Sequence, residues 1–382
     1  MSQLPELIAV RRQLHAHPEL AFEEHQTTAL LMRRLRAAGL EPRRLPQGTG
    51  LVVDIGSGPR TVGVRADIDA LPLHDATSTP YRSTLDGVSH ACGHDAHTAI
   101  ALGVALTLAR RRELPGRVRV IFQPAEERIP GGALNVIAAG EVDDVDLMLA
   151  LHCDPSLPVG EVGLRNGPLT AACDAVDITV SGPGGHTSRP HLTVDLVGAV
   201  GRVITEVPAL LHRRLDPRAG LSLVWGSVHT GNALNAIPTE AHLAGTVRSL
   251  DRPGWAGVEP LVRDLVEEVA RSSGAAVEID YRQGVPPVVN DVTLVDALRD
   301  AVIRTKGRAR VADTEQSLGG EDFGWYGEHI PVAMARLGVH GGGPRVDLHQ
   351  PSFDIDEAAI EVGVDTLVAA TLALLEPTPG FG

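Results

Sequence analysis

Strand-like and helix-like segments alternate along residues 1–173 and again along 287–382, and this alternation limits the possible folds more than any other feature. The strand-like runs are short, apolar and bounded by turn residues, whereas the segments between them have the apolar periodicity of helices. Such alternation predicts an α/β layer architecture. We expect strands at 51–55, 61–66, 118–122, 145–151 and 332–337, and helices at 98–110, 132–139, 293–305 and 357–375.

The pattern changes between residues 174 and 286. There the order is strand, helix, strand, strand, helix, strand, which is the split βαβ arrangement of ferredoxin-like folds. The following stretch, 283–290, contains Pro286 and Pro287 and is interpreted as the exit linker. Because 382 residues exceed the usual size of one hydrophobic core, two domains are expected. We predict a discontinuous α/β domain of 1–173 and 287–382, interrupted by an inserted domain of 174–286.

The net charge of −14 argues against nucleic acid or an anionic membrane surface as the main partner, because both attract basic faces. No segment offers roughly 18 unbroken apolar residues, and the N-terminus lacks the features of a signal peptide. Cys92, Cys153 and Cys173 cannot all pair, and so sparse a set is typical of cytoplasmic thiols. We therefore expect a globular cytoplasmic protein with neither a nucleic-acid nor a membrane partner.

The densest group of metal-binding residue types is Ser89-His90-Ala91-Cys92-Gly93-His94-Asp95-Ala96-His97, just before the expected helix at 98–110. Cys92 and His94 can reach one metal from this glycine-bearing loop, since borderline-soft divalent ions accept thiolate and imidazole. Any one of these residues alone is better explained by a helix start with surface histidines. Three histidines and a cysteine within nine positions favour a metal site.

Further candidate ligands stand where expected strands end. Glu126 and Glu127 come soon after the strand at 118–122, and sites in open α/β sheets form outside the carboxyl ends of strands. One carboxylate there could bind metal while the other transfers protons. His152 directly follows the strand at 145–151. Each has a plain alternative, because adjacent acids are commonly a solvated face and a lone histidine is more often structural.

Two more segments complete the set. His349 follows the glycines at 341–343, on a flexible loop that could deliver its side chain. Asp67 and Asp69 follow the strand at 61–66 and are either carboxylates that support the ligands or turn residues. Five sites at the ends of α/β elements together offer enough cysteine, histidine and glutamate for two metals. Their co-occurrence supports the metal hypothesis more than any single motif does.

With these motifs in view, the chain resembles the amidohydrolase branch of the metallopeptidases related to aminoacylase and glutamate carboxypeptidase. That branch includes hippurate hydrolases, auxin-conjugate hydrolases and N-acetyl-diaminopimelate deacetylases. The resemblance covers nearly the whole chain, from Arg11-Arg12-Gln13-Leu14-His15 and Pro18-Glu19-Leu20 to Leu348-His349-Gln350-Pro351. It implies an α/β/α metallopeptidase catalytic domain with an inserted ferredoxin-like α+β lid, through which the chain forms a homodimer.

The resemblance also implies roles for the motif residues. Glu126 matches the general base, and Asp67 matches an aspartate that orients a metal-bound histidine in relatives with an H-x-D motif. Here Arg65 occupies the position of that histidine, so the usual partner of Asp67 is absent. The implied ligands of two divalent ions are Cys92, His94, Glu127, His152 and His349. We expect these ions to be Zn²⁺ or Mn²⁺, with Co²⁺ or Ni²⁺ as alternatives.

In the expected lid, Gly184-Gly185-His186 resembles a motif whose histidine reaches the active site of a neighbouring subunit and stabilises the tetrahedral oxyanion. Asn235 resembles an asparagine that contacts substrate, and Arg248 is a candidate for binding the substrate carboxylate. Gly319 and Gly320 resemble a loop that lines the substrate pocket. The alternatives are a β-turn at the glycines and an ordinary surface arginine.

From these parts we expect metal-dependent hydrolysis of the amide bond of N-acyl amino acids or related small amides. The alternative within the same fold is a dipeptidase or carboxypeptidase. A metal-stabilised scaffold without catalysis is a third hypothesis, and retention of Glu126 together with all five implied ligands argues against it. The acyl group, the amino acid and the physiological metal depend on pocket shape, which the sequence does not specify.

Overall fold

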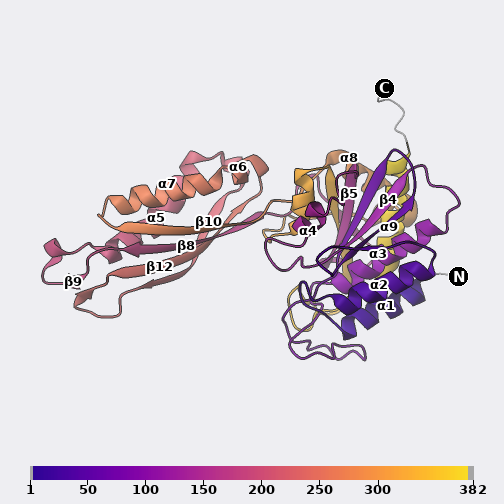
Figure 1. The fold of residues 1–382 in the computed structure, drawn as a ribbon, viewed down its shortest axis with the longest axis horizontal. Helices are drawn as coiled ribbons and strands as arrows, with labels where there is room; N and C mark the ends of the chain where they lie inside the picture. Colours follow the sequence, from indigo (N-terminus) through magenta and orange to yellow (C-terminus); the bar gives the residue numbers. More distant parts are fainter. Residues whose placement is uncertain (1–2, 377–382) are drawn as a thin grey trace, which may run out of the picture. The chain divides into compact units, whose positions relative to one another are not determined.

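The computed structural model describes residues 3–376, which divide into two compact units (Figure 1). Of the described residues, unit 1 comprises 3–169, Val288–Glu315 and 322–376, and unit 2 comprises Thr170–Pro287 and Gln316–Glu321. The chain therefore leaves the first unit and returns to it twice. Each unit is described by itself below.

Unit 1 is built on a mixed sheet in the order β1-β2-β4-β3-β5-β16-β6-β15. Its central strands β4, β3, β5 and β16 are parallel to one another, whereas β2 runs antiparallel to β4. The parallel strands are buried along nearly their whole length, as expected for a sheet with both faces covered. The strands are β1 (Arg43–Arg44), β2 (Leu51–Gly56), β3 (Thr61–Asp67), β4 (Arg117–Gln123), β5 (Leu147–Pro158), β6 (Val162–Leu164), β15 (Val311–Asp313) and β16 (Val332–His340).

Successive residues of these strands enter two different cores. On β5, Leu149 and Leu151 belong to the larger core, whereas Met148 and Ala150 belong to the smaller one on the opposite face. The larger core packs against α1 (Leu4–Ala16), α2 (His25–Ala37), α3 (His94–Ala109), α8 (Val292–Lys306) and α9 (Ala358–Leu375), and the smaller one against α4 (Ala133–Ala138) and η4 (Asp322–Glu328). Helices thus cover both faces, which confirms the predicted α/β/α layers.

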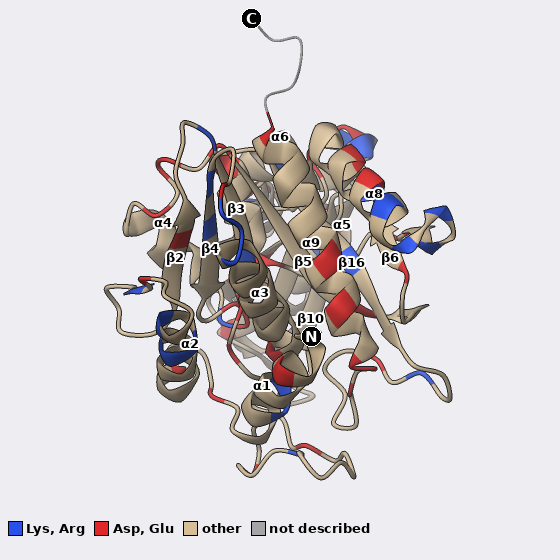
Figure 2. Ribbon diagram, turned by 90° about the vertical axis from the view of Figure 1, so that its right-hand side faces the viewer, with Lys and Arg blue, Asp and Glu red and all other residues tan. Residues whose placement is uncertain are grey.

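The most apolar helix of unit 1 is α9. By length and composition alone it could cross a membrane, but 67% of it is buried, and it packs against α3, α8 and β3. Glu361 and Asp365 interrupt its apolar run. These contacts identify α9 as a core helix of the unit. On the outer helices, acidic and basic residues are interspersed, as on α1 and α8 in Figure 2.

Unit 2 contains an antiparallel sheet in the order β10-β12-β8-β13, with α5 and α7 packed on one face (Figure 1). The chain order β8-α5-β10-β12-α7-β13 and this strand order are those of the split βαβ arrangement. Burial alternates along β8, so one side of the sheet faces the helices. The elements are β8 (Ala172–Ser181), α5 (Leu196–Arg214), β10 (Ser222–Thr230), β12 (Glu240–Ser249), α6 (Arg252–Ala256), α7 (Val258–Arg271) and β13 (Ala276–Val285), with the short strands β9 (Gly185–His186) and β11 (Ala236–Ile237).

Two expectations about local structure were wrong. The strand expected at 145–151 continues to Pro158, because β5 pairs with β16 beyond His152. The expected linker at 283–290 is also largely strand, since β13 runs to Val285 and β14 (Val289–Asn290) pairs with β7 (Gly167–Pro168).

Candidate metal centre

The candidate ligands of unit 1 gather where its parallel strands end. Strands β3 and β4 end at Asp67 and Gln123, and the neighbouring β5 carries His152. The cysteine–histidine loop enters α3 through Gly93, which has φ +86°. A Cβ at Gly93 would lie 2.7 Å from the Sγ atom of Cys153 on β5, so glycine permits this close approach. This packing brings the loop against β5.

Cys92 and His152 face each other across this contact. The Sγ atom of Cys92 lies 3.5 Å from Nε2 of His152, and both side chains are buried. His152 donates from Nδ1 to the backbone oxygen of Cys153 at 2.8 Å, which leaves the Nε2 lone pair facing the thiol. Burial lowers the pKa of His152 and raises the pKa of Cys92 well above its usual value. A neutral imidazole binds metal directly, and the buried thiol would lose its proton on binding one.

Asp69 determines the orientation of His94. His94 donates from Nδ1 to the backbone oxygen of Asp69 at 3.0 Å. One carboxylate oxygen of Asp69 lies 3.2 Å from the same nitrogen. The other carboxylate oxygen accepts the backbone N–H of Glu127 at 3.0 Å. Burial alone would lower the pKa of His94, but the neighbouring carboxylates outweigh it and raise this pKa to about 10. Asp69 therefore links two candidate ligands and concentrates negative charge around one of them.

His349 reaches the site from the loop before α9. Its Nε2 atom lies 3.2 Å from Oε1 of Glu127, and this contact raises the pKa of His349. Its backbone N–H donates to the oxygen of Ala91 at 2.8 Å, beside Cys92. The backbone of His349 has φ +59°, which is uncommon for a residue other than glycine. The loop is thus anchored to the cysteine–histidine motif at the point where it delivers its side chain.

Glu126 lies next to two of the candidate ligands. Ligand atoms of His94, Glu126 and Glu127 all lie within 4.8 Å of one another, and Glu126 is only partly buried. The chain reaches Glu126 through Ala125, a buried residue with φ +57°. A partly exposed carboxylate beside a ligand cluster is placed to receive a proton from water and to hand it on.

Asp67 contacts His97 and Arg65, and Arg65 occupies the position of the histidine that the resemblance pairs with this aspartate. Its Oδ1 atom accepts from Nδ1 of His97 at 2.6 Å, and its Oδ2 atom accepts from Arg65 at 2.7 Å. The Nε2 atom of His94 is 3.8 Å away. Burial alone would raise the pKa of Asp67, but His94, Arg65 and His97 lower it well below its usual value. Asp67 is therefore an ionised anchor for Arg65 and His97, while Asp69 orients His94.

The donor set fits a pair of metal ions. His94 Nε2 is buried and has no hydrogen-bond partner among the described residues, although Asp69 occupies its Nδ1 atom. Two groups of ligand atoms, each within 4.8 Å of one another, share the thiol of Cys92. One contains Cys92, His94 and His152, and the other contains Cys92, Glu127 and His349. Thiolate, imidazole and carboxylate together suit Zn²⁺ and its first-row neighbours.

Sequence reasoning did not assign Asp69 and His97 to definite roles. His97 uses both ring nitrogens within unit 1, since Nδ1 binds Asp67 and Nε2 accepts the backbone N–H of Cys153 at 2.8 Å. The available signals were its place in the cysteine–histidine motif and its position three residues after His94, on the same face of α3. For Asp69, the signal was its place just beyond the end of β3. Both residues hold ligand-bearing elements together.

In unit 2, His186 and Asn235 lie close together. Strand β9, which ends at His186, pairs with β11, and the backbone oxygen of Asn235 accepts from Thr187 at 3.2 Å. His186 is exposed, and its Nδ1 atom accepts from the backbone N–H of Ser188 at 3.1 Å. That bond leaves the proton on Nε2, so the exposed side chain of His186 can donate from Nε2.

Arg248 lies at the other end of β12. It donates to the backbone oxygen of Leu318, next to Gly319 and Gly320. A Cβ at Gly320 would lie 2.9 Å from Val285, so this glycine lets the segment approach β13 closely. Unit 2 thus brings Arg248 together with the two glycines. The pair His186 and Asn235 lies near the start of β12, and the eight residue steps from Glu240 to Arg248 span roughly 26 Å at the usual strand rise.

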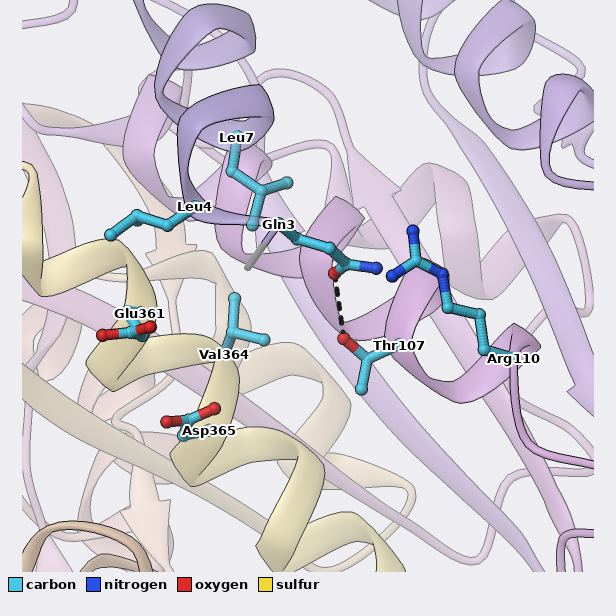
Figure 3. Close-up of a pocket in the computed structure, with 8 residues that line it drawn as sticks. All are labelled: Gln3, Leu4, Leu7, Thr107, Arg110, Glu361, Val364 and Asp365. Atoms are coloured by element: carbon cyan, nitrogen blue, oxygen red, sulfur yellow. Dashed lines mark hydrogen bonds between the residues drawn. The ribbon is translucent and has the colours of Figure 1, made fainter. Parts of the chain in front are cut away.

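Unit 1 also has a surface cavity outside this centre, between α1, α3 and α9 (Figure 3). Its volume is about 310 Å³, and the side-chain amide of Gln3 is hydrogen-bonded to the hydroxyl of Thr107 in its wall at 3.1 Å. Arg110 lies on one side, and Glu361 and Asp365 lie on the other. None of the candidate ligands lines it.

Comparison with known proteins agrees with this geometry. The family model for peptidase family M20/M25/M40 matches residues 63–373. The N-acetylcysteine deacetylase of Bacillus subtilis is 38% identical over 97% of this chain and 97% of its own length. A Rhodococcus jostii protein named as a glutamate–cysteine ligase is 48% identical over 96% of this chain, which spans only 46% of that protein. The YXEP protein of Bacillus subtilis, described as a dinuclear metal-binding peptidase, is 36% identical, with a TM-score of 0.85 over 97% of this chain and 98% of its own.

Proposed function

The chain belongs to peptidase family M20/M25/M40 and is an amidohydrolase, and on that premise we propose that it removes the acyl group from small N-acyl amino acids. The observation that carries the proposal is the placement of Glu126 within 4.8 Å of ligand atoms from His94 and Glu127. Metal-ligand residues with a partly exposed carboxylate beside them form the arrangement that metal-assisted amide hydrolysis requires.

Two divalent ions held by Cys92, His94, Glu127, His152 and His349 would polarise the amide carbonyl and make a bound water more acidic. The residues of the chain transfer the proton and hold the ligands in position. Glu126 accepts the proton of the attacking water and delivers it to the nitrogen of the leaving amine. Asp69 holds His94 in one ring orientation and fixes the backbone of Glu127 at the same time.

We further propose that His186 stabilises the negative oxygen of the tetrahedral intermediate through its Nε2–H group. The hydrogen bond from Ser188 to Nδ1 supports this role, because it selects the tautomer that donates from Nε2. We propose that this donor serves the site of a second copy of the chain, in a homodimer formed through the lid. Asn235 lies beside His186 and would contact the same substrate, whereas Arg248, Gly319 and Gly320 belong to the other end of the lid.

For the substrate, we propose an N-acetylated amino acid with a small side chain, and N-acetylcysteine is the first candidate. Two relatives support this choice. One is named for the deacetylation of N-acetylcysteine, and the longer Rhodococcus protein is named for joining glutamate to cysteine. Both names concern cysteine. A location in the cytoplasm, where thiols stay reduced, agrees with three free cysteines.

The test is release of free amine from N-acetyl, N-benzoyl and N-succinyl amino acids, including N-acetylcysteine and N-acetylserine, and from dipeptides. Each is assayed with and without chelator after reloading with Zn²⁺ or Mn²⁺. Chelator-sensitive turnover of the N-acyl compounds supports the proposal, and a preference for N-acetylcysteine over N-acetylserine supports the substrate. Turnover of dipeptides alone would instead indicate a dipeptidase or carboxypeptidase of the same fold.

A further inference from the structure

Unit 1 contains a buried carboxyl group that belongs to none of the ligand groups. Glu24, just before α2, has no exposed surface, and its Oε1 atom accepts the backbone N–H of Ala125 at 2.8 Å. The two residues are 101 positions apart in the sequence. Burying a carboxyl group costs free energy unless it is hydrogen-bonded. The specific bond to the Ala125 N–H therefore indicates that the backbone at Ala125 needs this acceptor.

That requirement lies in the backbone of Ala125. With φ +57°, Ala125 adopts a left-handed conformation that residues with a Cβ rarely occupy, and it immediately precedes Glu126. Its N–H is held by Glu24, and its carbonyl oxygen accepts from Gly132 at 2.9 Å. Both backbone polar groups of Ala125 are therefore fixed, and they set the direction in which the chain enters Glu126.

The other side of the same loop is held by a neighbour of Glu24. The guanidinium group of Arg128 lies over the ring of Phe22, 5.8 Å from its centroid. Phe22 also has a positive φ of 67°. Thr28 ties this segment to α2, because its hydroxyl donates to the backbone oxygen of Glu24 at 2.6 Å. Residues 22–24 thus contact the loop both before Glu126 and after Glu127.

We infer that residues 22–24 form a positioning segment, in which the side chains of Phe22 and Glu24, and not that of Glu23, hold Glu126 and Glu127 in their working orientation through Ala125 and Arg128. Its kinetic consequence rests on the proposed function, because only an amidohydrolase would need Glu126 directed at a water molecule. The segment touches no candidate ligand in the contacts described, and it acts through the loop backbone alone. Small displacements of a proton-transfer group reduce turnover far more than they reduce binding.

The kinetic experiment compares Glu24→Ala and Glu24→Gln with Glu23→Ala in the metal-loaded full chain. Glu23 is the matched control, because its side chain is 74% exposed. Glu24→Ala is expected to lower kcat about 100-fold, with KM within about twofold and two metals still bound. Glu24→Gln should recover kcat to within about fivefold of wild type, because its amide oxygen still accepts the Ala125 N–H. Glu23→Ala should match wild type.

A second readout does not require turnover. Hydrogen exchange followed by mass spectrometry should show faster exchange in the peptide covering 124–128 of Glu24→Ala, with no change in α3. Phe22→Ala, which removes a half-buried ring and should fold even if Glu24→Ala does not, is expected to raise exchange in the same peptide and lower kcat two- to fivefold. If wild type hydrolyses nothing, the proposed function fails, and the exchange data alone decide the positioning role.

Several results would overturn the inference. One is an unchanged kcat in Glu24→Ala, and another is a loss of kcat in Glu24→Gln as large as that in Glu24→Ala. A third is a loss of bound metal that parallels the loss of activity. The last is unchanged hydrogen exchange at 124–128 in both Glu24→Ala and Phe22→Ala.

Discussion

The wild-type protein should lose stability as pH rises from 5 to 8, and the Glu24→Gln variant should lack this contribution to the loss. Burial, followed by the nearby Asp69 charge, raises the pKa of Glu24 from its usual 4.5 to about 7. The folded state therefore holds a proton on this group over a pH range in which the unfolded chain has already released it. Between these two pKa values the folded state binds more protons, so stability falls as pH increases.

The magnitude follows from the two pKa values. A rise from 4.5 to about 7 corresponds to about 3 kcal/mol in total, because each pKa step of one is worth about 1.4 kcal/mol. About 2.5 kcal/mol of this lies between pH 5 and pH 8, and the loss is complete above the folded-state pKa. Glutamine carries no titrating group, so the free energy of unfolding of the variant should rise by about this much relative to that of wild type across the same interval.

The assay is urea unfolding of both proteins at several pH values, with chelator present so that bound metal does not contribute. Only the difference between variant and wild type is interpreted, because all other titrating groups are common to both. Glu23→Gln serves as the control and should run parallel to wild type. A difference between Glu24→Gln and wild type that stays constant from pH 5 to pH 8 would refute the argument, because Glu24 would then titrate alike in both states.

Three further predictions concern residues of the proposed mechanism. Glu126→Gln should keep both metals, measured by elemental analysis, and lower kcat by roughly 10²–10⁴-fold, whereas near-normal turnover would remove its assignment as base. Cys92→Ala should reduce the bound metal per chain, and unchanged stoichiometry would exclude the thiol as a ligand. His186→Ala should lower kcat by roughly 10²–10³-fold, and mixing it with Glu126→Gln should restore activity in hybrid dimers; no restoration would contradict service to a partner site.

Much of the fold could be predicted because local patterns and long-range packing agree. Helix α3 is expected at 98–110 from its alanine and leucine content and is found at His94–Ala109. The split βαβ order could likewise be read directly from the sequence. Prediction was wrong where long-range pairing decides the end of an element, as in the extension of β5 past His152 by its pairing with β16.

The candidate site divides in a similar way. Cys92, His94, Glu126 and Glu127 stand in compact motifs whose residue types reveal metal chemistry, and the structure brings these residues together. The supporting residues could not be identified in this way. Asp69 and Asp67 look alike in sequence, and only the fold shows which of them contacts His94. Glu24 has no signal at all, because its partner is a backbone N–H on a distant loop.

The most direct test of the account is a titration of metal-free protein with Zn²⁺ or Mn²⁺, with turnover of N-acetylcysteine followed as each equivalent is added. We expect no turnover without metal and a rise that is complete at two equivalents per chain, with Glu126→Gln binding the same two without turnover. Full turnover in the presence of excess chelator, or activity complete after a single equivalent, would contradict a two-metal amidohydrolase.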